Sequence, residues 1–109
     1  MFPSEMLRHA ETVLQQLRAR RMTLATAESC TGGWVGQCLT AIAGSSGWFD
    51  RGFITYSNDA KIEILGVSAD ALAAHGAVSE AIAAAMALGA NSILSAKGSS
   101  FALFIAFGS

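Results

Sequence analysis

The fold class follows from residues 23–39, TLATAESCTGGWVGQCL. The first five, residues 23–27, form a short β-favouring run that breaks at the turn-forming residues 28–33. From Trp34 to Ala43 the apolar residues return with helical periodicity. The stretch therefore predicts a strand, a tight loop and a helix N-terminus in direct succession.

On the N-terminal side of this stretch, residues 4–20 predict an amphipathic helix, because apolar residues recur there at three- and four-residue spacing. Ser4 is the expected N-cap. Arg18, Arg20 and Arg21 lie at the other end, where cations suit the helix dipole.

On the C-terminal side, the sequence predicts a turn at residues 44–47 and then a strand at residues 49–57, FDRGFITYS, which is rich in β-branched and aromatic residues. Asn58 is expected to cap a short helix that runs to Leu65 and is closed by Gly66.

The last part of the chain predicts two helices and a strand. Ser68 and Ser79 are the expected N-caps of helices at about 69–75 and 80–90. Residues 101–107, FALFIAF, form a continuous apolar run, which is typical of a strand buried on both faces. The alternation of helices and strands predicts an α/β sandwich in a single domain, residues 1–109.

Composition restricts the function. The net charge of −1 and the pI of about 6.0 argue against a nucleic-acid binder or a polybasic membrane module, so a small-molecule partner is expected. No apolar run approaches the ~18 residues of a membrane span, and no signal peptide is recognised, so we expect a cytoplasmic protein. Neither a disulfide framework nor a zinc site is expected from Cys30 and Cys38.

The first candidate site is the loop between the strand and the helix, residues 27–34. Two glycines and a helix N-terminus there can present backbone N–H groups to a phosphate or an oxyanion. The alternative is that Gly32 and Gly33 only permit a sharp turn. The spacing matches neither a dinucleotide-binding loop nor a Walker loop.

Two further candidates are the turn at 43–47, with Ser45 and Ser46, and the segment 55–61. Lys61 falls in the first turn of its helix, where the dipole disfavours a cation, and a neutral lysine can act as a base. Tyr56 could relay a proton beside it. The alternative is a surface lysine and a half-buried core tyrosine.

A Cys30 hydrolase with His75 as its base is another possibility, because a thiol near a helix N-terminus is acidified. His75 lies in an Ala-His-Gly turn, where a surface or capping role is more usual. His9 lies on an ordinary helix surface. No acidic residue stands at ligand spacing from either histidine, so a metal site has no support.

Several motifs in order resemble the C-terminal domain of the competence/damage-inducible protein family, whose stand-alone bacterial members are nicotinamide-nucleotide amidases. The resemblance covers about residues 5–90. It is carried by AESCTGG at 27–33, AGSSGWF at 43–49, RGFITYSNDAK at 51–61, LGV at 65–67 and HGAVSE at 75–80.

This resemblance implies hydrolysis of the carboxamide of nicotinamide mononucleotide, giving nicotinate mononucleotide and ammonia in pyridine-nucleotide salvage, without a metal or an organic cofactor. By motif position, Ser46 is the implied nucleophile and Lys61 its base, with Tyr56 and Ser29 as supporting hydroxyls. The implied substrate-binding residues are Thr31, Gly32, Gly33 and Ser45.

The family fold implied is a three-layer α/β/α sandwich with a mixed sheet, usually seen as a dimer, so a homodimer or higher oligomer is expected. After Ala90 the sequence departs from the family pattern. Residues 101–107 take the place of a strand, and roughly the last third of the domain is expected to be missing, with its C-terminal strands, helix and phosphate-binding arginine. The rival hypothesis is a catalytically silent remnant that only binds a nucleotide or associates through its last strand.

Overall fold

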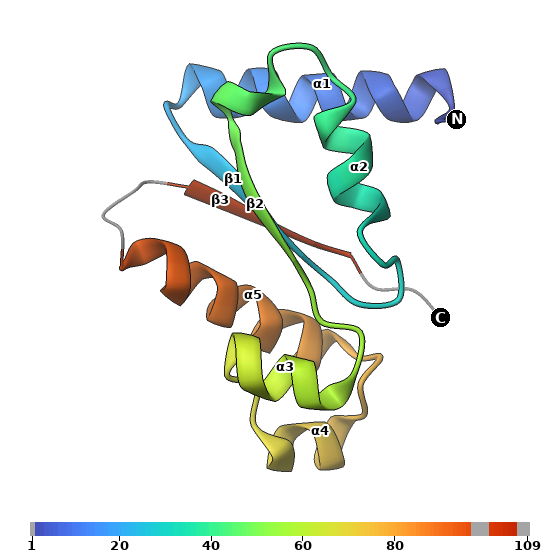
Figure 1. Cartoon of the computed structure of the whole chain (residues 1–109), viewed down its shortest axis with the longest axis vertical. Helices are drawn as coiled ribbons and strands as arrows, with labels where there is room; N and C mark the ends of the chain where they lie inside the picture. The colour runs from blue at the N-terminus through green and yellow to red at the C-terminus, as the bar shows by residue number, and fades with distance from the viewer. Residues whose placement is uncertain (1, 97–100, 107–109) are drawn as a thin grey trace.

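The protein folds into three layers, as a computed structural model that describes residues 2–96 and 101–106 shows (Figure 1). A three-stranded sheet lies in the middle, with α1 (Ser4–Ala19) and α2 (Trp34–Thr40) on one face. Three helices cover the other face: α3 (Asn58–Leu65), α4 (Ala69–His75) and α5 (Glu80–Ser95). The predicted α/β/α sandwich is therefore confirmed.

The strand order in the sheet is β2-β1-β3, with β1 (Thr23–Glu28) between β2 (Phe49–Ile54) and β3 (Phe101–Ala106). Both pairings of β1 are parallel, and Glu28 lies opposite Ile54 on one side and Ala106 on the other. The three strands thus end at the same edge of the sheet. All described pairings are parallel, because helices or long loops connect the strands, whereas the resemblance implied a mixed sheet.

Each face of the central strand supports its own apolar core. Leu24 faces α1 and α2, and Ala27 faces the layer of α3, α4 and α5. The first core comprises Ala10, Leu14, Leu17, Leu24, Cys38 and Leu39. The second comprises Ala27, Leu65, Val67, Leu72, Ile82, Met86 and Ala90.

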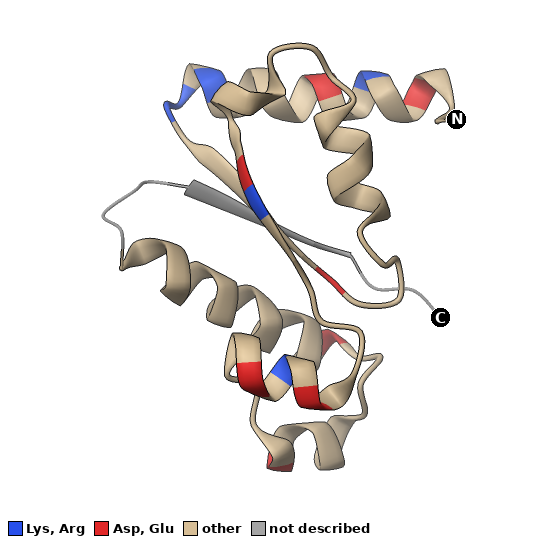
Figure 2. Ribbon diagram, viewed as in Figure 1, with Lys and Arg blue, Asp and Glu red and all other residues tan. Residues whose placement is uncertain are grey.

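Helix α5 packs on the sheet and is nearly uncharged, because Glu80 at its start is its single charged residue (Figure 2). Its closest approach is to the end of α3, because a Cβ built on Gly89 would lie 1.9 Å from the carbonyl oxygen of Leu65. Only glycine lets these two backbones meet.

Two of the predicted N-caps are wrong and two are confirmed. Pro3, rather than Ser4, occupies the N-cap of α1, and its carbonyl accepts a hydrogen bond from the Leu7 N–H at 3.1 Å. Ser57 Oγ, rather than Asn58, caps α3 by accepting from the Ala60 N–H at 3.0 Å. The hydroxyls of Ser68 and Ser79 cap α4 and α5 as expected.

Several boundaries also differ from the sequence prediction. The second strand ends at Ile54 rather than residue 57, α2 ends at Thr40, and α5 continues to Ser95 rather than 90. The turn at 44–47 contains a short 3₁₀ helix, η1 (Ser45–Gly47). The sequence also predicted that the last strand is buried on both faces. That prediction concerns side chains that the structure does not describe, and residue 107 also lies outside the described residues.

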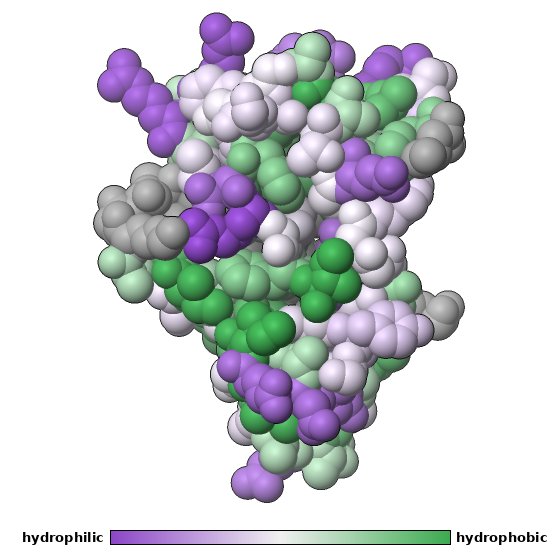
Figure 3. Space-filling view, in the orientation of Figure 1, coloured by the Kyte–Doolittle hydropathy of each residue, from purple (hydrophilic) through white to green (hydrophobic). Residues whose placement is uncertain are grey.

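None of the helices in the described part of the chain is both long and apolar enough to cross a membrane. Large apolar side chains are nevertheless exposed on β2 and α3, at Ile54 and Ile64, and Figure 3 shows apolar surface in the middle of this face.

Candidate active site

The candidate site lies at the edge where the parallel strands end. There β1 leads into the loop 29–33, and β2 leads into residues 55–57, which precede α3. Ligands of parallel sheets usually bind outside the carboxyl ends of the strands. The predicted residues Ser29 and Lys61 both come from segments that leave this edge.

Lys61 is buried in the site, with only 1% of its surface exposed. Its Nζ donates a hydrogen bond to the main-chain carbonyl of Tyr56 at 3.2 Å. The alternative of a surface lysine is therefore wrong. No carboxylate of the described residues lies within salt-bridge distance of Lys61, so its amine is not held in an ion pair.

Ser29 meets Lys61 at the same carbonyl oxygen. Ser29 is buried at 6% exposure, and its Oγ donates to the Tyr56 carbonyl at 3.5 Å. That distance is long for a hydroxyl donor, so the bond is weak and the hydroxyl can turn toward another partner. The hydroxyl and the amine thus both lie within hydrogen-bond distance of one main-chain oxygen.

Tyr56 contributes its carbonyl rather than its ring to this arrangement. The residue is 73% exposed, so the alternative of a half-buried core tyrosine is wrong. Within the described residues its phenol makes no hydrogen bond to Ser29 or Lys61.

Glu28 is the residue that the sequence analysis missed. It is 1% exposed, and its carboxylate accepts hydrogen bonds from the Thr31 hydroxyl at 2.7 Å and from the backbone N–H groups of Val35 and Gly36, both at 2.9 Å. An acidic residue that ends a strand and precedes a short loop into a helix could have suggested this contact, because carboxylates are favoured at helix N-termini.

The glycine loop therefore does not present the start of α2 to an external anion, because Glu28 already occupies that position. The loop does need its glycines, since Gly32 and Gly33 adopt φ values of 60° and 100°. Among the described residues, no acceptor is found for the backbone N–H groups of Cys30, Thr31 and Gly33. These groups belong to the loop that begins with Ser29.

Ser46 lies at the other end of β2. It is exposed on η1, which precedes the strand, whereas Lys61 follows it (Figure 1). A strand rises about 3.3 Å per residue, so six residues separate the two ends by roughly 20 Å. Ser45 is buried beside Ser46, and its Oγ donates to the Thr40 carbonyl at 3.4 Å. The structure does not bring Ser46 or Ser45 to Lys61 within this chain.

Cys30 and His75 are not joined by any hydrogen bond in the described part of the chain. Both cysteines are free, Cys30 exposed and Cys38 buried. His75 is exposed at the end of α4, and His9 is exposed on α1. Across residues 2–96, no group of three or more His, Cys, Asp or Glu side chains gathers to hold a metal ion.

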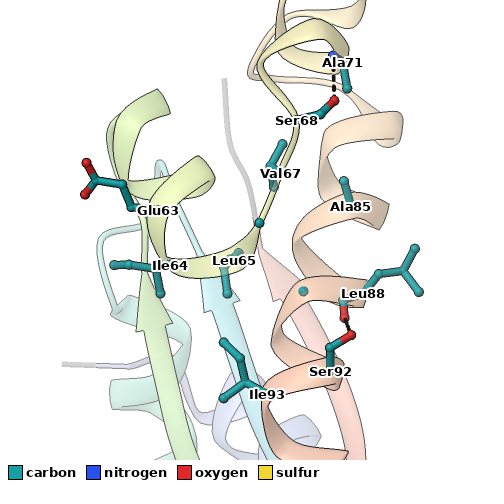
Figure 4. Close-up of a pocket in the computed structure, with 12 residues that line it drawn as sticks. Glu63, Ile64, Leu65, Val67, Ser68, Ala71, Ala85, Leu88, Ser92 and Ile93 are labelled. Carbon is teal, nitrogen blue, oxygen red and sulfur yellow. Dashed lines mark hydrogen bonds between the residues drawn. The ribbon is translucent and has the colours of Figure 1, made fainter.

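Two hollows of the surface lie away from these residues. A groove of about 610 Å³ runs between α3 and α5, with Ile64 and Ile93 on its opposite sides (Figure 4). A smaller hollow of about 370 Å³ lies near Arg18 and Trp48, on the α1 side. Neither contains Ser29, Lys61 or Ser46 in its lining.

Comparison with known proteins identifies what this arrangement resembles. A family model described as the CinA C-terminal domain matches residues 6–102. A protein named nicotinamide-nucleotide amidohydrolase PncC, from Escherichia coli K12, is 57% identical over 90 residues, covering 83% of this chain and 54% of the relative. A CinA-like protein of Syntrophobacter fumaroxidans is 59% identical over 80 residues, covering 73% of this chain and 19% of that relative.

The fold is also shared with solved structures. The competence/damage inducible protein CihA from Agrobacterium tumefaciens superposes with a TM-score of 0.82 at 44% identity, covering 85% of this chain and 56% of that one. The chain spans about half the length of the PncC relative that it matches.

Proposed function

The chain belongs to the CinA C-terminal domain family, and on that premise we propose that its site hydrolyses the carboxamide of nicotinamide mononucleotide to nicotinate mononucleotide and ammonia. The name of the PncC relative, a nicotinamide-nucleotide amidohydrolase, supports the choice of substrate. The single observation that carries the proposal is that the Ser29 hydroxyl and the Lys61 amine both donate hydrogen bonds to the Tyr56 carbonyl.

We assign the nucleophile to Ser29 rather than to Ser46. A nucleophile and its base must lie within hydrogen-bond reach of each other, directly or after a small movement. Ser29 Oγ and Lys61 Nζ both contact the Tyr56 carbonyl, so a small movement can bring them together. Ser46 has no such contact, because β2 separates it from Lys61. The resemblance implied a supporting role for the Tyr56 hydroxyl; we assign that role to the Tyr56 main-chain carbonyl instead.

The proposed reaction begins when the Ser29 hydroxyl gives its proton to Lys61 Nζ and Oγ attacks the carboxamide carbon. The C–N bond then breaks, and the leaving amine takes the proton from Lys61 and departs as ammonia. Water, deprotonated by Lys61, attacks the resulting ester; the ester bond to Oγ breaks, the carboxylate leaves, and Oγ regains a proton. The free N–H groups of Cys30 and Thr31 are suited to stabilise the oxyanion formed in both steps.

The substrate-binding roles implied for Thr31, Gly32 and Gly33 fit this arrangement, because the three residues form the loop that carries Ser29. Ser45 does not fit, because it lies with Ser46 at the opposite end of β2. We further propose that the chain acts in the cytoplasm. We also propose that it forms a homodimer or higher oligomer, which the exposure of Ile54 on β2, an outer strand of the described sheet, supports.

The test is ammonia release from nicotinamide mononucleotide, measured for the chain and for three variants. Ser29→Ala and Lys61→Met should each lose activity by about 10³-fold or more, while Ser46→Ala should keep it. Circular dichroism confirms that each variant is folded, which matters because Lys61 is buried.

A dead Ser46→Ala together with an active Ser29→Ala would return the nucleophile to Ser46. A folded wild-type chain that releases no ammonia would contradict the proposed activity and favour a silent domain.

A further inference from the structure

Glu28 has a defined place in this site that neither the resemblance nor the comparisons assign. We infer that Glu28 is a positioning residue, whose buried carboxylate fixes the loop that carries the Ser29 hydroxyl and the free N–H groups beside it. The inference rests on the proposed function, since it concerns the geometry of the same reaction.

The carboxylate of Glu28 is hydrogen-bonded both to the loop and to the start of α2. Oε1 accepts from the Thr31 hydroxyl, in the middle of the loop, and from the Val35 N–H. Oε2 accepts from the Gly36 N–H. Because Ser29 follows Glu28 directly in the chain, the loop is fixed at its start, at its centre and at the helix that it enters.

The backbone of Glu28 connects the loop to the other half of the site. Its carbonyl accepts a hydrogen bond from the Thr55 N–H at 2.9 Å. Thr55 is followed by Tyr56, whose carbonyl receives Ser29 and Lys61. One residue therefore links the serine loop to the segment that holds the base.

A positioning role suits these contacts better than proton transfer. Among the described residues, the donors to this carboxylate are Thr31, Val35 and Gly36. The Ser29 hydroxyl instead donates to the Tyr56 carbonyl. A buried carboxylate is costly unless its oxygens are hydrogen-bonded, and here the start of a helix supplies two of the donors.

The first test is Glu28→Gln, which keeps the shape of the side chain but puts an amide NH₂ where one oxygen faces an N–H group. We expect kcat for ammonia release to fall by about 100-fold, because a small misplacement of reacting groups has effects of that size, while KM changes by less than about threefold. Glu80→Gln is the matched control, since Glu80 is an exposed acid in the first turn of α5.

Thr31 provides a second, milder test. Thr31→Val removes the hydroxyl that holds Oε1 and should lower kcat in the same direction, whereas Thr31→Ser keeps the hydroxyl and should restore it. A role in folding alone would lower the melting temperature without this pattern of loss and rescue in kcat.

A serine-directed fluorophosphonate gives a readout that does not depend on turnover. Oγ of Ser29 attacks phosphorus, fluoride leaves, and mass spectrometry locates the adduct. Glu28→Gln should react at least about tenfold more slowly than wild type, and Glu80→Gln at the wild-type rate.

The outcomes separate this inference from the proposed function. If Ser29→Ala is inactive but folded Glu28→Gln reacts and turns over like wild type, the inference alone is wrong. If the wild-type chain neither reacts at Ser29 nor releases ammonia, the proposed function is wrong. In that case, amide hydrogen exchange at residues 30–36 of Glu28→Gln is compared with that of the wild-type chain. Faster exchange in the variant would support the inference, and unchanged exchange would overturn it.

Discussion

Buried single residues determine the chemistry of this protein more than its motifs do. Among the described residues, the buried charged side chains are Lys61 and Glu28, and each has a different kind of hydrogen-bond partner. Within the described part of the chain, Glu28 has three donors, whereas Lys61 has one carbonyl acceptor. The first is thus held firmly, and the second keeps donor capacity that a substrate can use.

The two cysteines should differ in reactivity. Burial raises the pKa of the Cys38 thiol, so less thiolate is present at a given pH, whereas Cys30 is exposed. With iodoacetamide at pH 8, the native chain should take up one label, at Cys30, and a second only after unfolding.

Cys30→Ala should therefore abolish labelling of the native chain, with peptide mapping as the check. Equal labelling of both thiols in the folded protein would show that Cys38 is accessible.

Arg21 occupies a backbone conformation that favours glycine. It ends α1 at φ 54°, with its N–H bonded to the Arg18 carbonyl and the Met22 N–H bonded to the Leu17 carbonyl. This pattern is the Schellman motif, in which the left-handed residue is usually glycine. Arg21→Gly should stabilise the fold by up to about 1 kcal/mol in urea unfolding, and Arg20→Gly, where φ is −96°, should not.

At the level of elements, the contact of α3 with α5 is the most restrictive. Gly89→Ala would place a methyl group against the Leu65 carbonyl, so the helices must separate. Alanine gains about 1 kcal/mol in helix propensity, but we expect a net loss of about 2 kcal/mol or more in the free energy of unfolding, because backbone atoms must shift.

Gly47→Ala is the control for this substitution, since a Cβ there has no neighbour within 4 Å. It should leave the melting temperature almost unchanged. A stable Gly89→Ala variant would mean that α5 can slide away from Leu65 at little cost.

The elements themselves follow from local patterns, but the site does not. Helix periodicity and serine caps predicted α4 and α5, because those signals are local in sequence. The hydrogen bond from Ser29 to Tyr56 joins residues 27 apart, and it depends on β1 and β2 pairing in parallel. The family resemblance implied that Ser46 and Lys61 act together. In the structure, β2 lies between them, so they lie at opposite ends of this strand.

The alternation of helices and strands along the chain predicted an α/β sandwich, and the family resemblance implied its three layers. What the alternation could not predict is which side chains would be buried at the sheet edge. The burial of Glu28 and Lys61 depends on donors and acceptors supplied by other segments, and composition carries no information about those partners.

At this scale we also expect the activity to be independent of metal. Ammonia release should continue unchanged after dialysis against EDTA, because the proposed reaction uses only a hydroxyl, an amine and backbone N–H groups. Restoration of a chelated, inactive sample by zinc would contradict the Ser29 and Lys61 assignment. The melting temperature with and without EDTA serves as the control for folding.

The acceptor at the centre of the site is a main-chain oxygen, and this makes position 56 unusually open to change. Every amino acid carries the same carbonyl, so substitution of the Tyr56 side chain leaves both hydrogen bonds in place. The exposed side chain at position 56 can therefore be exchanged without removing the carbonyl that receives Ser29 and Lys61. Selection for new specificity could act at residue 56 without first having to rebuild the reaction centre.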